Sequence, residues 1–176
     1  MVALILGTGF EPLEAVAPCD ILRRGGIEVC CASVGERLVE AGHGIRIEAD
    51  CTVAELDAEK LDMIVLPGGL GGVQSILGSE ETLELIRRVY DEGKFVAAIC
   101  AAPSILAKLG ITDGRKATCY PGFEPKMGSA VMQSCGAVRD GTVITGRAAG
   151  SADEFGLLCL QALKGKAAAD QVAADI

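Results

Sequence analysis

The sequence predicts one α/β domain over residues 1–176, with a mostly parallel sheet covered by helices on both faces. Apolar runs of strand length alternate along the chain with segments of helical periodicity, which is the pattern of parallel βαβ units. Half of the 176 residues are apolar but only 3% are aromatic. The core must therefore consist mainly of Ala, Val, Ile and Leu, as in a sheet that is buried on both sides.

Four strands and one helix are predicted in the first half of the chain. Continuous apolar runs predict buried strands, and alternation of apolar and polar residues over 45–49 predicts a half-buried one. The four strands are Val2–Leu6, residues 27–33, residues 45–49 and Met63–Leu66. The helix begins at Pro12 and ends near Arg24, because two glycines follow that residue.

The second half continues the alternation. Residues 80–92 and 103–109 are predicted helices on either side of a buried strand, Phe95–Ile99. Residues 138–145 are predicted to form a hairpin around an Asp-Gly turn. A last helix is expected from Ser151, as its cap, to Lys164, and the Ala-rich tail after about residue 166 has no defined pattern.

Charge and composition exclude several classes of partner. The net charge is −8, and the Lys and Arg residues form no basic run. Binding to phosphate backbones needs a clustered positive patch, so no nucleic-acid partner is expected. The first residues lack a positive segment, and their apolar run is too short for a signal peptide or a membrane span. We therefore expect a cytoplasmic protein without a membrane partner.

The cysteines and glycines predict no bound metal or cofactor. The eight cysteines include no C-x-x-C pair and His43 is the single histidine, so neither a zinc site nor a disulfide framework is expected. Most of these thiols are interpreted as small buried apolar residues. The segment Gly7-Thr8-Gly9 resembles part of a nucleotide-binding loop, but Pro12 stands where that loop needs Gly and no loop Lys is present.

The candidate site lies where three predicted strands end. Active sites of open parallel sheets form at the carboxyl ends of the strands, so residues 7–14, 67–72 and 99–103 are expected to meet. Cys100 follows a buried strand and precedes a helix, which resembles a nucleophile elbow with Ala and Ile in place of its glycines. The helix N-terminus should make Cys100 the most acidic of the thiols. The alternative is an inert buried cysteine.

Glu14 and two glycines complete the candidate site. Glu14 lies on an apolar helix face, and burial against Cys100 would favour its protonated form and a role as general acid and base. The alternative is a carboxylate that merely stabilises the helix N-terminus. Gly68 and Gly69 permit unusual backbone angles, so their N–H groups can face a developing oxyanion. A tight turn alone would also explain them.

Five segments together make the chain resemble the ThiJ/PfpI superfamily, in the branch of the parkinsonism-associated deglycase and its YajL-like relatives. They are Glu11-Pro12-Leu13-Glu14, residues 19–27, Leu66-Pro67-Gly68-Gly69, residues 98–103 and Asp153-Glu154-Phe155. The resemblance covers nearly the whole chain and implies a flavodoxin-like three-layer α/β/α sandwich and a homodimer. It also implies a nucleophilic Cys100, a protonated Glu14, and oxyanion donors in the N–H groups of Gly69 and Ala101.

The resemblance offers three functions. The first is a glyoxalase or deglycase acting on small 2-oxoaldehydes, with Gly68, Tyr120 and Arg24 as the candidate substrate pocket. The second is a redox-sensing or chaperone-like stress protein with an oxidisable Cys100. The third is a peptidase or amidase. Tyr120 stands where many members carry a histidine, and a phenol with a pKa near ~10 is a poor base at neutral pH.

Overall fold

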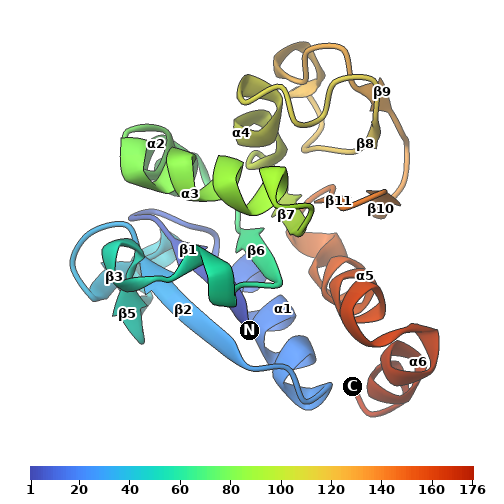
Figure 1. The fold of residues 1–176 in the computed structure, drawn as a ribbon, viewed down its shortest axis with the longest axis horizontal. Coiled ribbons are helices and arrows are strands. Elements are labelled where there is room, and N and C mark those ends of the chain that lie inside the picture. Colours follow the sequence, from blue (N-terminus) through green and yellow to red (C-terminus); the bar gives the residue numbers. More distant parts are fainter.

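A seven-stranded sheet forms the centre of the protein, of which a computed structural model describes residues 1–176 (Figure 1). The strand order is β10-β11-β7-β6-β1-β2-β5. All neighbouring strands are parallel except the β10–β11 hairpin. The strands are β1 (Val2–Leu6), β2 (Val29–Ser33), β5 (Cys51–Thr52), β6 (Met63–Leu66), β7 (Phe95–Ile99), β10 (Ala137–Asp140) and β11 (Val143–Gly146).

Helices cover both faces of this sheet. One face packs against α1, α5 and α6, and the other against α2, α3 and α4. The helices are α1 (Pro12–Arg24), α2 (Leu70–Leu77), α3 (Glu80–Asp91), α4 (Pro103–Lys108), α5 (Ala152–Lys164) and α6 (Lys166–Ala174). None of them is long and apolar enough to cross a membrane. The predicted α/β sandwich with a mostly parallel sheet is confirmed.

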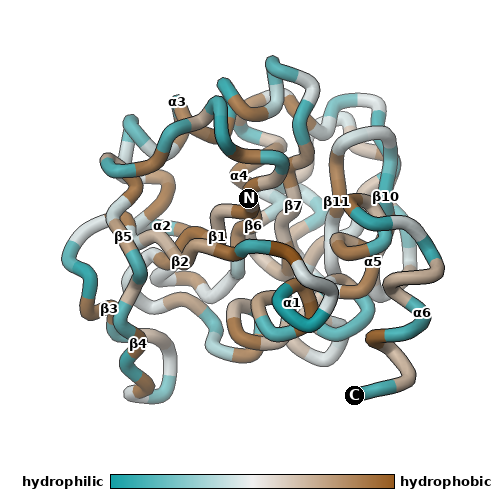
Figure 2. Tube along the Cα trace, turned by 60° about the horizontal axis from the view of Figure 1, so that its bottom comes forward, coloured by the Kyte–Doolittle hydropathy of each residue, from teal (hydrophilic) through white to brown (hydrophobic).

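The strand β1 shows why the sheet must be covered twice. All five of its residues are buried, and alternate side chains enter two separate apolar clusters. Leu4 belongs to the cluster under α1 and α5, whereas Ile5 belongs to the cluster under α2, α3 and α4. Figure 2 shows the hydrophobic residues gathered along these central strands. The predicted bounds of β1, β6, β7 and α1 agree with the structure.

Several sequence predictions need correction. Residues 45–49 do not join the main sheet, because β4 (Arg46–Glu48) pairs antiparallel with β3 (Leu38–Glu40) in a separate ribbon. The helix α2 was not predicted, since its two glycines indicate a turn. The helix α6 falls in the tail that had no defined pattern. Ser151 precedes α5, but its side chain makes no capping hydrogen bond.

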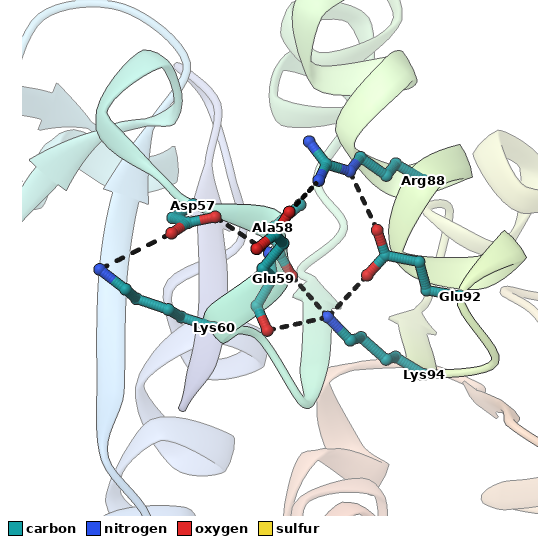
Figure 3. A network of polar contacts seen from close by, with 7 residues as sticks. All are labelled: Asp57, Ala58, Glu59, Lys60, Arg88, Glu92 and Lys94. Atoms are coloured by element: carbon teal, nitrogen blue, oxygen red, sulfur yellow. Dashed lines mark hydrogen bonds and ion pairs between the residues drawn. The ribbon is translucent and has the colours of Figure 1, made fainter.

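A polar network lies at the end of the sheet where β6 and β7 begin (Figure 3). Lys94 Nζ donates to the carbonyl oxygens of Ala58 at 2.7 Å and Glu59 at 3.1 Å, and it pairs with Glu92 at 2.7 Å. Arg88 bridges Glu92 and Glu59 at 3.0 and 3.3 Å. These contacts join the loop before β6 to the end of α3. The candidate site lies at the opposite end of the sheet, where these strands end.

Candidate active site

The three segments expected to meet do meet, around Gly68. A Cβ atom built on Gly68 would lie 2.6 Å from Glu14 Oε2 and 2.7 Å from Cys100 Cβ. Gly69 has φ +84°, and a Cβ there would lie 2.6 Å from the carbonyl oxygen of Gly9. Such distances are too short for any side chain. Only glycine at these positions lets the loop after β6 approach Glu14 and Cys100 this closely.

Cys100 occupies a sharp turn between β7 and α4. Its φ is +66°, a conformation that is strained for a residue with a side chain. Two hydrogen bonds hold this turn: the Cys100 N–H donates to Gly146 O at 2.9 Å, and the Cys100 carbonyl accepts the Tyr120 N–H at 2.7 Å. The thiol is partly exposed. This is the strand-to-helix elbow that the sequence predicts.

Glu14 lies in the first turn of α1 and is only 1% exposed. Its Oε2 accepts the Gly68 N–H at 2.8 Å, whereas Oε1 is buried without a hydrogen-bond partner. Burial raises the pKa of Glu14 above its usual 4.5, although the Cys100 thiol and the Gly68 N–H oppose that rise. A buried carboxyl group with one unpartnered oxygen favours the protonated form, as the sequence predicts for Glu14.

The expected acidity of Cys100 is wrong. Burial raises the pKa of its thiol to about 12, and an ionised Glu14 adds to the rise, while the N–H groups of Ala101 and Gly69 oppose it. The helix that follows has only six residues, so its dipole does not outweigh burial. Cys19 is instead the thiol whose pKa is lowered, to about 7, mainly by its hydrogen bond with Cys31.

Glu14 and Cys100 influence each other's ionisation in opposite ways. An ionised Glu14 raises the cost of a negative charge on the sulfur, whereas the neutral Cys100 thiol stabilises a negative charge on Glu14 through a hydrogen bond. A second negative charge at this site is therefore disfavoured. When Glu14 keeps the proton, its repulsion disappears and the sulfur can carry the charge. The arrangement can thus move a proton between sulfur, carboxyl group and a bound reactant.

The structure brings some of the predicted pocket residues together and leaves one apart. Gly68 lies against both Glu14 and Cys100. Tyr120 donates its backbone N–H to the Cys100 carbonyl, and the residue is 46% exposed. Arg24 lies ten residues after Glu14 on α1, about 15 Å along the helix axis. It pairs there with Asp20 at 2.7 Å. Helix geometry thus keeps Arg24 away from Cys100 within one chain.

His43 and Gly146 complete the comparison with the sequence. The side chain of His43 is 81% exposed and lies 3.9 Å from Glu11, so this single histidine is a solvent-exposed residue. Gly146 was not predicted at the site, because its role depends on β11 pairing beside β7.

A cavity of about 340 Å³ lies beside α1, and it is lined by Cys19 and Cys31 rather than by Cys100.

Replacing Glu14 with Gln should make the protein more stable at neutral and alkaline pH. A raised pKa in the folded state gives stability that is present below pH 4.5 and is lost as the pH rises through the folded value. Thermal melting of both proteins between about pH 4 and about pH 8 measures this. The two melting temperatures should converge at the acid end. A constant difference across the range would show that Glu14 does not change its charge.

Known proteins match this chain in sequence and in fold. The model of the DJ-1/PfpI family matches residues 1–162. Protein dj-1beta of Drosophila melanogaster is 37% identical over 97% of this chain and 92% of its own, and its crystal structure superposes with a TM-score of 0.93 over 99% and 95% of the two chains.

Two further relatives carry informative names. A protein of Pyrococcus horikoshii that is named a deglycase is 34% identical over 83% of this chain and 89% of its own. A structure of oxidised DJ-1 from Toxoplasma gondii superposes with a TM-score of 0.95 at 31% identity, over 99% and 96% of the two chains. The full-length match in sequence and in fold leaves one conclusion: this chain belongs to the DJ-1/PfpI family.

Proposed function

We propose that this protein is a cysteine-dependent enzyme that converts small 2-oxoaldehydes, such as methylglyoxal, to 2-hydroxy acids without glutathione. The observation that carries the proposal is the pair of Cys100 and Glu14, whose side chains interact directly beside Gly68. A nucleophile and a buried carboxyl group that exchange one proton are the two parts this isomerisation needs. The name of the Pyrococcus relative also supports aldehyde chemistry.

The proposed reaction begins with addition of the thiol to the aldehyde. The step uses the ionised form of Glu14: the carboxylate takes the thiol proton, the sulfur bonds to the aldehyde carbon, and the carbonyl oxygen receives the proton back from the carboxyl group, which gives a hemithioacetal. The N–H groups of Gly69 and Ala101, which lower the pKa of the Cys100 thiol, would stabilise negative charge that develops beside the sulfur. The sulfur that has bonded to the substrate carbon is the leaving group of the last step.

Glu14 then moves a hydrogen between the two carbons. The carboxylate removes the proton from the former aldehyde carbon, a carbon–carbon double bond forms, and the ketone oxygen takes the negative charge of an enediolate. The hydroxyl proton of the former aldehyde carbon moves to that oxygen, and return of the first proton to the neighbouring carbon gives a thioester of the hydroxy acid. Water hydrolyses the thioester and restores the thiol, so that one water is added overall. A peptidase or amidase role is ranked last, because a chain with Tyr120 at the position of the histidine lacks an obvious base for expelling an amine.

Cys100→Ser should abolish turnover of methylglyoxal. Lactate formation in glutathione-free buffer, followed by NMR, measures the rate, and Cys135→Ser is the matched control because Cys135 is another partly exposed thiol. We expect a loss of at least about 10³-fold for the Cys100 variant and little change for the control. If the Cys100 variant keeps the wild-type rate, the proposed enzyme is refuted.

A redox-sensing role is the second candidate. The sulfur of Cys100 is partly exposed and is approached by the N–H groups of Ala101 and Gly69, which would also stabilise the oxygens of a sulfinate. Peptide mass spectrometry after peroxide treatment measures the oxidation. Oxidation at Cys100 in a protein that does not turn over methylglyoxal would favour this role over the enzyme.

We also propose a homodimer built on α1. Leu13 and Val16 leave 60% and 51% of their surface exposed on this helix, whereas Ile21 and Leu22 are buried against the sheet. Exposed apolar residues on one helix face are typical of subunit interfaces. Sedimentation of wild type should give twice the 18.1 kDa chain mass, and Val16→Glu should shift it to the monomer. A wild-type monomer at micromolar concentration would contradict the proposal.

A further inference from the structure

Two cysteine sulfurs lie close together away from Cys100, near the edge of the sheet that β2 and β5 form. The Sγ atoms of Cys30 on β2 and Cys51 on β5 are 3.0 Å apart, about 1 Å longer than the ~2.05 Å of a disulfide bond. Strand pairing explains the approach. Ala32 pairs with Cys51 in register, and alternation places Cys30 on the same face as Ala32. The two thiols are therefore diagonal neighbours on one face.

The surroundings permit the two sulfurs to join. Both cysteines are partly exposed, so a small oxidant can reach them. β5 has only two residues and lies at the edge of the sheet, paired on one side with β2. A shift of β5 toward Cys30 therefore disturbs no second strand. Burial, and next the hydrogen bond with Cys51, raise the pKa of Cys30 to about 12, so proximity rather than acidity is the reason for these thiols to couple.

We propose that Cys30 and Cys51 form a reversible disulfide when the protein meets a hydroperoxide. One thiol attacks the peroxide, the O–O bond breaks, and a sulfenic acid and an alcohol (water, for hydrogen peroxide) result. The second thiol then attacks the sulfenic sulfur, and water leaves. The two thiols together lose two electrons and two protons, and the peroxide is reduced.

This site is independent of the proposed reaction at Cys100. In the strand order, β2 is three positions from β7, about 14 Å at the usual strand spacing. The neighbouring pair of Cys19 and Cys31 is a poorer candidate, since its sulfurs are 3.9 Å apart and Cys19 is buried. Cys31 also points to the opposite face from Cys30, because they are consecutive residues of one strand.

The disulfide would close a loop that contains the β3–β4 ribbon. That ribbon supports the segment before Glu14, because Gly9 N–H donates to Glu40 O at 2.7 Å and Gly42 N–H donates to Phe10 O at 2.8 Å. A cross-link between residues 30 and 51 restricts the unfolded chain and should stabilise the folded one. The expected effect is a rise of roughly 5–10 °C in the melting temperature of the oxidised protein.

The test is peptide mapping of full-length protein after treatment with a small excess of hydrogen peroxide. Wild type and Cys100→Ser should both give a peptide that joins Cys30 to Cys51, lost on addition of dithiothreitol. Cys51→Ser should lack this peptide and the rise in melting temperature, while the matched control Cys135→Ser keeps both. Persistence of the peptide in Cys100→Ser separates this result from any result on turnover.

Three outcomes would overturn the proposal. In the first, peroxide oxidises Cys100 to its sulfinic acid and leaves Cys30 and Cys51 as free thiols. Another is a cross-link from either cysteine to a different cysteine, or between two chains, in place of the one proposed. The third is a wild-type protein in which the linked peptide forms without any rise in the melting temperature. Mapping of the wild type decides the first two even if Cys51→Ser does not fold.

Discussion

Replacing Glu14 with Gln should lower the turnover of methylglyoxal by about 10²–10⁴-fold, the usual contribution of a general acid and base. Glutamine keeps the size of the side chain, and its amide oxygen can still accept the Gly68 N–H that Glu14 Oε2 accepts at 2.8 Å. It cannot remove a proton from carbon. The loss should therefore appear in kcat, with the fold intact by thermal melting.

Glu11→Gln is the matched control for this variant. Glu11 precedes the same helix, and a quarter of its side chain is exposed, so it tests for a general effect of negative charge near the site. The control should retain turnover to within a few-fold. Wild-type kcat in Glu14→Gln would remove the carboxyl group from the mechanism and leave Cys100 without its partner.

The second large effect is expected for Gly68→Ala. The added Cβ would lie 2.6 Å from Glu14 Oε2, 2.7 Å from Cys100 Cβ and 2.9 Å from Ile99 O. Two of these neighbours are the reacting groups, and the third is backbone that cannot yield without moving the elbow. We expect kcat/KM to fall by more than about 10²-fold, since small displacements of reacting groups carry such losses. Overpacking should also cost about 1–3 kcal/mol of stability.

Gly35→Ala provides the comparison, because a Cβ on Gly35 would meet no atom within 4 Å and its φ is not in the left-handed region. Its kcat/KM and melting temperature should stay close to wild type. Steady-state kinetics and thermal melting of the two variants measure both effects. A Gly68→Ala protein with full activity would mean that the placement of Glu14 and Cys100 does not depend on the close approach that Gly68 permits.

The sequence alone was sufficient for the elements that are buried on both sides. β1, β6 and β7 are continuous apolar runs of four or five residues, and only a covered parallel sheet accommodates several such runs. The meeting of Glu14, Gly68 and Cys100 followed from one topological rule, that parallel strands end at the same edge. Each of these residues comes at or shortly after the end of a strand.

Properties that depend on three-dimensional surroundings were not predictable. The acidity of Cys19 comes from Cys31, which lies on another element, and the pKa of Cys100 depends on burial and on the charge of Glu14. The sequence places Arg24 on the right helix but cannot show that its own chain directs it away from Cys100. The glycines of α2 indicate a turn locally, and packing of Val73 and Ile76 against the sheet makes that segment a helix.

The central claim is that Glu14 controls the ionisation of Cys100 and exchanges a proton with it, and pH-dependent alkylation tests this dependence most directly. Iodoacetamide labelling of each thiol is followed by mass spectrometry from neutral to alkaline pH, in wild type and in Glu14→Gln. In wild type, Cys100 should label only at high pH, because burial and Glu14 raise the pKa of its thiol to about 12. In Glu14→Gln, the labelling of Cys100 should move to lower pH, while Cys135 and the other thiols stay unchanged. Identical Cys100 profiles in the two proteins would contradict the account.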